Sequence, residues 1–256
     1  MFLEKGNNMD AITVMKRREF KFILTREQLS FLKQSLVGHM DVDQYGKTTI
    51  LSLYYDTPDF RLIRESIERP TFKEKIRLRS YGLNHDDNPV FLELKRKNQG
   101  VVYKRRIALK EKEATSFFND ENSLEYNQIG KEITYFRNYY KKLIPQIMVI
   151  YDRVAYKNDS DLRLTIDENP RYRAYDLNMN SSTDGMLLLP HGSAILEIKA
   201  QEEIPLWLVQ ILSEGKIYKT TFSKVGEAYK QIKQRQIVLN NLERRQSYEI
   251  TIWFVA

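Results

Sequence analysis

Charged residues recur at every second position in several short segments of the chain, and apolar residues separate them. The clearest cases are Phe91–Lys95 (FLELK) and Ile195–Lys199 (ILEIK), in which a glutamate and a lysine lie two residues apart. Related patterns are found in Glu19–Phe22, Lys75–Arg79, Lys104–Leu109 and Arg163–Asp167. In a β-strand, residues i and i+2 point to the same side of the sheet. Each segment therefore predicts a strand with one apolar face and one face of Lys, Arg and Glu.

The charged faces favour cations, and this bias indicates an anionic ligand. One strand of this kind is typical of a solvated sheet with cross-strand ion pairs. Six or seven of them, with helices available to cover the apolar faces, predict an α+β fold. We expect an antiparallel β-barrel, closed or nearly closed, with a polar, basic lumen and flanking α-helices. Unpaired buried ions cost several kcal/mol each, so an anion should fill the lumen. Arg and Lys are the side chains that hold phosphate oxygens, which favours a polyphosphate group.

Composition limits the protein class. The chain has 256 residues and a formal net charge of +7, with no cysteine and three histidines. The absence of cysteine excludes disulfides, thiolate zinc sites and a cysteine nucleophile, and three histidines argue against a histidine metal site. No apolar run approaches the ~18 residues of a membrane helix, and the first residues lack a signal-peptide core. We therefore expect a cytoplasmic protein with an anionic partner.

The chain reads as one continuous domain over residues 17–245, after a lead-in over 1–16 and before a tail over 246–256. Thr25 and Gln28 fit a capping box at the start of a helix that runs to about residue 37. Further helices are expected at 59–67, 111–119, 127–142, 205–213 and 224–245. Strands are expected at 48–56, 71–81, 89–97, 101–110, 146–156, 161–168, 171–176 and 193–200. The apolar tail from residue 248 is β-like, and its role is open.

Several short segments of the chain resemble a known family, the VTC domain (polyphosphate polymerase) of the CYTH-like triphosphate tunnel metalloenzyme superfamily. The matching pieces occur in the family's order and are Arg18–Lys21, Leu53–Thr57, Ile76–Gly82, Phe91–Lys95, Tyr151–Arg153, Leu196–Lys199 and Phe222–Lys224. The resemblance implies a β-barrel tunnel with a triphosphate or polyphosphate held by basic residues. It also implies a divalent metal, Mn²⁺ or Mg²⁺, held by acidic residues. In this family the terminal phosphoryl of a nucleoside triphosphate is transferred onto a growing polyphosphate chain.

Site residues follow from the matched positions and from the strand pattern. The resemblance implies catalytic or phosphate-gripping roles for Lys21, Arg77, Arg79, Lys95, Arg153 and Lys224. Further substrate-binding residues are expected to be Lys104, Arg106 and Lys199, and Arg64 by a looser match. Glu197 resembles the principal metal ligand, and Glu93, Glu19 and Asp167 are candidate helpers. A hard divalent ion needs only one or two such carboxylates together with substrate oxygens.

Three function classes stay open from the sequence. The first is a phosphotransferase that polymerises polyphosphate from ATP, and the second is a tunnel triphosphatase acting on tripolyphosphate or a nucleotide. Arg17 stands where the hydrolytic branch usually has a first glutamate, which favours the polymerase. The third class is a non-catalytic binder of polyphosphate or nucleic acid. DNA is not expected as a partner, because the strand pattern places the cations inside a channel rather than on an open surface. A separate membrane partner protein could hold the domain at the inner face of a membrane.

Overall fold

The computed structural model describes residues 18–68, 71–84, 88–99, 101–124, 127–158, 161–201 and 203–255. The strands are β1 (Arg18–Leu24), β2 (Asp41–Asp56), β3 (Phe72–Tyr81), β4 (Val90–Asn98), β5 (Val101–Leu109), β6 (Ile144–Lys157), β7 (Arg163–Arg173), β8 (Met186–Leu187), β9 (Ala194–Ala200) and β10 (Lys219–Thr220). The helices are α1 (Arg26–Ser35), α2 (Arg61–Ile67), α3 (Glu111–Phe118), α4 (Gln128–Tyr140), α5 (Leu206–Glu214) and α6 (Lys224–Val255). The expected lead-in over 1–16 lies outside the described residues.

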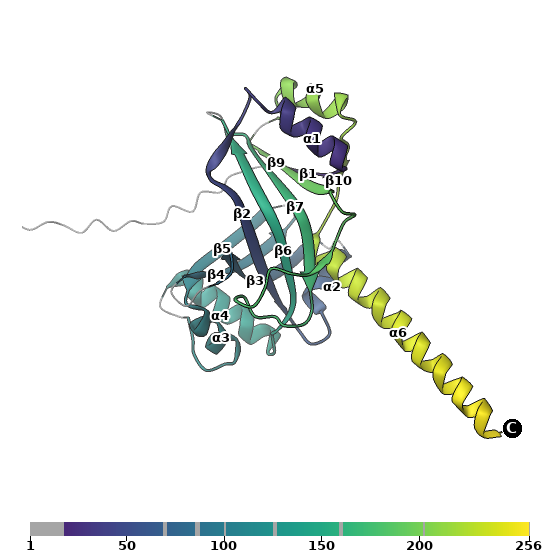
Figure 1. The fold of residues 1–256 in the computed structure, drawn as a ribbon. Helices are drawn as coiled ribbons and strands as arrows, with labels where there is room; N and C mark the ends of the chain where they lie inside the picture. Colours follow the sequence, from purple (N-terminus) through teal and green to yellow (C-terminus); the bar gives the residue numbers. More distant parts are fainter. Residues whose placement is uncertain are drawn as a thin grey trace, which may run out of the picture.

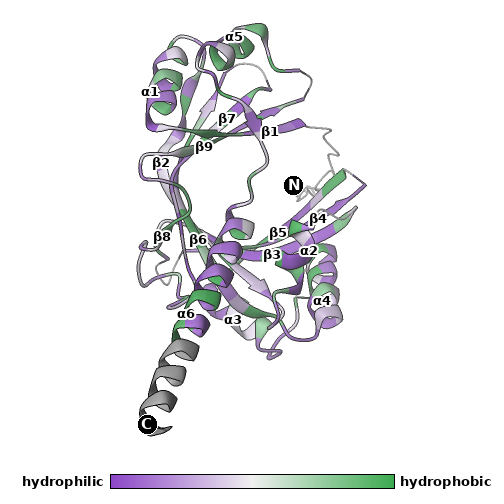
Figure 2. Cartoon of the chain, turned by 90° about the vertical axis from the view of Figure 1, so that its right-hand side faces the viewer, coloured by the Kyte–Doolittle hydropathy of each residue, from purple (hydrophilic) through white to green (hydrophobic). Residues whose placement is uncertain are grey.

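One large antiparallel sheet forms the centre of the molecule. Its strand order is β10-β1-β9-β7-β6-β2-β3-β4-β5, and β8 pairs with β7. The sheet curls so that β1 and β9 lie across from β4 and β5 (Figure 2). Within the described part, β5 has no hydrogen-bonded pairing with β1 or β10. The α+β antiparallel architecture is therefore confirmed, but the expected closure of a barrel is not found.

Helices cover the outer, apolar side of the sheet at both ends. α3 and α4 pack on β3, β4 and β5 through a cluster that includes Leu78, Leu92, Phe117 and Phe136. α1 and α5 pack on β1, β7 and β9 through a second cluster. The first turn of α6 instead packs on the inner side, where Val225 and Ala228 meet β2 and β6. The rest of α6 projects away from the sheet (yellow in Figure 1).

Several local predictions are confirmed, and two are wrong. Thr25 and Gln28 form both bonds of the predicted capping box. The two strands expected at 161–168 and 171–176 are one strand, β7, whose pairing with β6 shifts register between Ile150 and Asp152. The β-like tail is helical, because α6 continues to Val255. Branched apolar residues favour strands locally, but an established helix gains one hydrogen bond for each residue added.

Asp56 fixes the start of α2 from a buried position. Its Oδ1 accepts hydrogen bonds from the backbone N–H groups of Thr57 (2.7 Å) and Leu62 (2.8 Å), and its Oδ2 accepts from Ile63 (2.8 Å). We expect Asp56→Ala to lower the free energy of unfolding by about 2–3 kcal/mol, because two helix N–H groups lose their acceptor inside the protein. Urea unfolding measures the change. Asp59→Ala is the matched control, since Asp59 is exposed and pairs with Arg64, and it should cost less than about 1 kcal/mol. Equal losses in both variants would contradict the capping role.

Candidate functional site

Cross-strand register places the predicted site residues on one side of the sheet. Residues opposite each other on neighbouring strands share a face, and the pairs include Lys21 with Glu197 and Arg153 with Asp167. Arg77 pairs with Glu93, which pairs in turn with Arg106. This inner side, with Lys224 from α6, is called the charged face. Its cations are Lys21, Lys75, Arg77, Arg79, Lys95, Lys104, Arg106, Arg153, Lys199 and Lys224, and its carboxylates are Glu19, Glu93, Asp167 and Glu197.

Glu93 lies at the centre of the β3–β5 arm and is 2% exposed. Its Oε2 accepts from Arg77 Nη2 (2.7 Å) and Nε (2.9 Å). Lys104 Nζ lies 2.8 Å and Arg106 Nε 3.1 Å from its Oε1, and Arg79 Nη2 lies 3.8 Å from Oε2. Burial opposes its ionisation, but Arg77, Arg79 and Lys104 outweigh burial and lower its pKa to about 2. Glu93 thus contacts four cationic side chains but balances only one of their four positive charges.

The two arginines of β3 retain hydrogen-bonding capacity. Arg77 also donates from Nη1 to Tyr54 Oη (2.8 Å), so its contacts occupy three of the five N–H groups of a guanidinium. Arg79 is buried, and its Nε has no hydrogen-bond partner within the described residues. A buried donor without an acceptor is destabilising. An anion seated beside β3 would satisfy it.

The other side of the curled sheet, formed by β1, β9, β7 and β6 together with α6, is called the opposite arm. It carries a more balanced group of charges. Arg153 forms a two-pronged contact with Asp167, from Nε to Oδ1 (2.6 Å) and from Nη2 to Oδ2 (2.8 Å). Lys224 Nζ lies 2.5 Å from Asp167 Oδ2 and 3.7 Å from Glu197 Oε1. Lys21 Nζ joins Glu197 (3.4 Å) to Glu19 (3.2 Å). Burial opposes ionisation of Glu197, yet Lys224, Lys21 and Arg153 lower its pKa, so it is a carboxylate at neutral pH.

Of the remaining predicted residues, Lys95 and Lys199 join this arrangement and Arg64 does not. Lys199 lies opposite Glu19 on β1. Lys95 extends from β4, and its pKa is lowered by burial, with Lys21 and Arg77 adding to the effect and Glu19 and Glu197 opposing it. Lys21, Glu19 and Glu197 belong to β1 and β9, so charges on that side of the curled sheet influence Lys95 on the other side. Arg64 lies on α2 and contacts Asp59, and its side chain is half exposed.

Lys75 also lies on the charged face, although it was not among the predicted site residues. The all-cationic pattern of Lys75–Arg79 could have indicated it. Lys75 lies opposite Lys95 on β4 and donates to Ser223 Oγ (3.2 Å), just before α6. Burial lowers its pKa to about 8, and the charges of Lys95, Lys73 and Lys21 act in the same direction while Tyr54 opposes them.

The pKa of Tyr54, which lies on β2 beside Arg77, is also lowered to about 8. Burial of the phenol raises this pKa, but the charges of Arg77, Lys75 and Arg79 outweigh burial.

Anion binding should therefore weaken as the pH rises through about 8. Lys75 is an ammonium below its pKa and a neutral amine above it, so its attraction for phosphate is lost between pH 7 and 9. We expect the Kd of tripolyphosphate, measured by calorimetry, to rise severalfold over that range. Lys75→Arg stays charged and should show a flatter profile, whose remaining slope reports Tyr54, Lys95 and Lys104. Identical profiles in the two proteins would show that Lys75 does not face the anion.

The residues present fit a metal bound partly by substrate. Among the residues described, no group of three or more His, Asp and Glu is arranged to hold a metal ion. A closed protein cage is therefore not found. Glu197 is ionised and lies close to Lys21 and Lys224 on the charged face, which suits Mg²⁺ or Mn²⁺ binding through one or two carboxylates and phosphate oxygens. Asp167 and Glu93 are each engaged by closely placed cations, which makes them less available as ligands.

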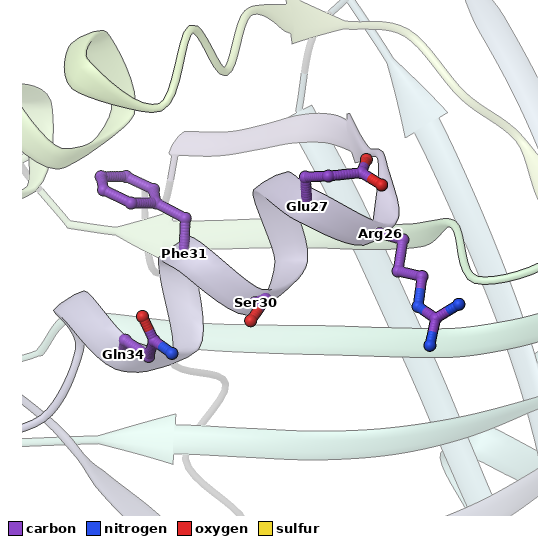
Figure 3. Close-up of a pocket in the computed structure, with 5 residues that line it drawn as sticks. All are labelled: Arg26, Glu27, Ser30, Phe31 and Gln34. Carbon is purple, nitrogen blue, oxygen red and sulfur yellow. The ribbon is translucent and has the colours of Figure 1, made fainter.

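A hollow elsewhere on the surface lacks these features. It lies along α1, on the outer side of the sheet, and Figure 3 shows its side chains projecting from that single helix. It is lined by Arg26, Glu27, Ser30, Phe31 and Gln34. No other element supplies a lining side chain to it within the described part of the chain. It is therefore a poor candidate for a phosphate site.

Solved structures identify the class of fold. A Bacillus halodurans protein described as a candidate adenylate cyclase matches with a TM-score of 0.53, at 14% identity, covering 82% of this chain and 94% of the other. A Hippeastrum protein of the same kind, described as having a dominant triphosphatase activity, matches with a TM-score of 0.54, at 17% identity, covering 82% and 93%. This chain therefore shares the fold of these two proteins.

The sequence identifies the family to which the chain belongs. The profile of the VTC domain matches residues 16–233, and the chain belongs to that family. Subunit 4 of the vacuolar transporter chaperone complex is 25% identical in Trypanosoma cruzi, over 78% of this chain and 32% of that protein. The Schizosaccharomyces pombe subunit 4 is 24% identical, over 77% and 34%. This chain therefore spans about a third of the length of these relatives.

Proposed function

We propose that the charged face binds a nucleoside triphosphate, ATP in the first instance, end to end with a polyphosphate chain. The terminal phosphoryl of the nucleotide is then transferred to the chain. The observation that carries this proposal is the imbalance on the β3–β5 arm, where Lys75, Arg77, Arg79, Lys95, Lys104 and Arg106 face one carboxylate, Glu93. Such an excess of cations on a partly buried surface is stable only with anions beside it.

The chain's own residues can supply what phosphoryl transfer requires. The reaction requires little covalent chemistry from the protein, so its catalysis depends mainly on alignment of the reactants and neutralisation of their charge. Arg77 and Arg79 hold neighbouring phosphates, and Lys21, Lys95 and Arg153 approach from the other strands. A terminal oxygen of the polyphosphate attacks the γ-phosphorus, and the bond from that phosphorus to the β–γ bridging oxygen breaks. ADP leaves with the electron pair, and no protein nucleophile takes part.

Glu197, with Glu19 beside it, is the proposed holder of Mn²⁺ or Mg²⁺. When bound, such an ion polarises phosphoryl oxygens and offsets charge that develops on the leaving group. Lys21 and Lys224 keep Glu197 ionised and fix its position between β1 and α6.

Hydrolysis is the second candidate, because the same grip on a triphosphate suits attack by water. The Hippeastrum protein with this fold is described as having a dominant triphosphatase activity, which supports this alternative. A non-catalytic polyphosphate binder is the third. The names of the relatives, which are subunits of a complex, support assembly with further subunits. A separate membrane partner protein is part of the same proposal. Among the described residues, no helix is both long and apolar enough to cross a membrane.

Incubation of the purified protein with ATP and Mn²⁺ separates these functions. A polymerase yields ADP together with long anionic chains that resolve as a ladder on a polyacrylamide gel. Release of ADP and free phosphate without a ladder assigns hydrolysis instead. Binding of polyphosphate without any ADP release assigns the non-catalytic role.

A further inference from the structure

Two aromatic residues, Tyr81 and Phe91, lie at one end of the charged face, beyond the arginines that are proposed to hold phosphates. Tyr81 lies at the end of β3, two residues beyond Arg79 on the same side of the strand. Its ring meets Phe91 of β4 edge to face, with 5.7 Å between the ring centroids. Arg106 of β5 lies over Phe91, 3.9 Å from the ring centroid, and over Tyr81 at 5.6 Å. Three adjacent strands thus contribute to one partly exposed cluster.

Arg106 connects this cluster to the phosphate grip. Its Nη2 donates to Tyr81 Oη (2.7 Å), while its Nε lies 3.1 Å from Glu93. The guanidinium is therefore held from both sides, and it orients the phenol ring of Tyr81. Tyr81 as a whole remains 47% exposed, so its side chain is open to a ligand.

The two ends of the charged face differ in chemistry. Moving along β3 away from Tyr81, the same side carries Arg79, Arg77 and then Lys75, at steps of about 6.6–6.8 Å. Lys75, Lys95 and Lys104 form a single cross-strand row at the far end. A ligand that lies along this face therefore meets an aromatic surface, then two arginines, then three lysines. A nucleoside triphosphate has the matching order, with a flat base at one end and its γ-phosphate at the other.

We propose that Tyr81, Phe91 and Arg106 form the subsite for the nucleobase of the nucleoside triphosphate. The base stacks on the exposed ring of Tyr81, the α- and β-phosphates lie along Arg79 and Arg77, and the γ-phosphate points to the lysine row. Stacking on an aromatic ring accepts any base, because every base has a π-face. The subsite therefore favours nucleotides over inorganic tripolyphosphate and discriminates weakly among bases. This inference rests on the proposed function, because it assumes that the arginines hold the phosphates.

Two ligands that differ in the nucleoside test the subsite. Calorimetry at fixed Mg²⁺ gives the Kd of the β,γ-imido analogue of ATP and of tripolyphosphate for the wild type, Tyr81→Ala and Tyr135→Ala. Tyr135 is the control, since it is 69% exposed on α4, on the outer side of the sheet. We expect Tyr81→Ala to weaken the nucleotide analogue by roughly 5- to 150-fold, the range that base stacking supplies. Its Kd for tripolyphosphate should stay within about twofold, and Tyr135→Ala should change neither constant. Phe91→Leu, which keeps an apolar contact for Arg106, should weaken only the analogue, and by less than Tyr81→Ala.

Each other outcome is decisive. Equal losses for both ligands in Tyr81→Ala, or no loss for either, overturn the base subsite while leaving the phosphate site intact. A wild-type protein that binds both ligands with the same affinity also overturns it, because the nucleoside then contributes nothing. A wild type that binds neither ligand removes the proposed function, and the subsite with it.

Discussion

Arg77→Lys is expected to lower kcat/KM by roughly 5- to 150-fold, the equivalent of about 1–3 kcal/mol for lost charge-assisted hydrogen bonds in the transition state. Lysine keeps the charge, so Glu93 stays neutralised and the fold is preserved. It cannot reproduce the planar fork that contacts Glu93 with Nε and Nη2 and Tyr54 with Nη1. Arg79→Lys should behave in the same way. Steady-state kinetics with ATP and Mn²⁺ measure both variants.

The control for these exchanges is Arg18→Lys. Arg18 starts β1, is well exposed, and lies 3.9 Å from Glu203, which is more exposed still. Kinetics indistinguishable from wild type are expected for this variant. If Arg77→Lys and Arg79→Lys also matched wild type, the two arginines would serve only to neutralise Glu93, and the proposed grip would lose its main support.

Glu197→Gln is expected to abolish turnover while leaving the protein folded. Glutamine has nearly the same shape, but it carries no charge for a divalent ion. The structural cost should be limited, since Lys21 keeps Glu19 and Lys224 keeps Asp167 as partners. Turnover assays and circular dichroism report activity and folding separately. The variant should also lose the dependence of tripolyphosphate affinity on Mn²⁺.

Glu214→Gln is the matched control for Glu197→Gln, because Glu214 ends α5 on the outer side of the sheet. It should retain wild-type turnover. Full activity of Glu197→Gln, or full activity of the wild type in excess chelator, would contradict a metal held by Glu197.

The charged face could be predicted from the sequence because alternation is a local property of a strand. Glu93 with Lys95, and Glu197 with Lys199, share a side in any strand that contains them, and the structure confirms this. Which strands lie side by side depends on long-range pairing, which the pattern does not encode. The meeting of Lys104 and Arg106 with Glu93 follows from the β4–β5 register, and the contact of Lys224 with Asp167 depends on the packing of α6.

Properties of the whole sheet were the hardest to predict. Closure depends on whether the edge strand β5 pairs with β1 or β10, and no single strand carries that information. Lys75 looked like one more cation of its strand, and only its place beside Ser223 and opposite Lys95 distinguishes it. The continuation of α6 overrides the strand preference of the last residues, because helix propagation begins many residues earlier.

A crystal structure of the protein with bound tripolyphosphate would show directly whether the charged face holds phosphates. We expect three phosphates in a row along this face, with the first two contacting Arg79 and Arg77 and the third close to the Lys75–Lys95–Lys104 row. Arg79 Nε, which lacks a partner among the residues described here, should donate to a phosphate oxygen. Tripolyphosphate bound on the outer side of the sheet, for example along α1, with the charged face unchanged, would contradict a phosphate site on the charged face.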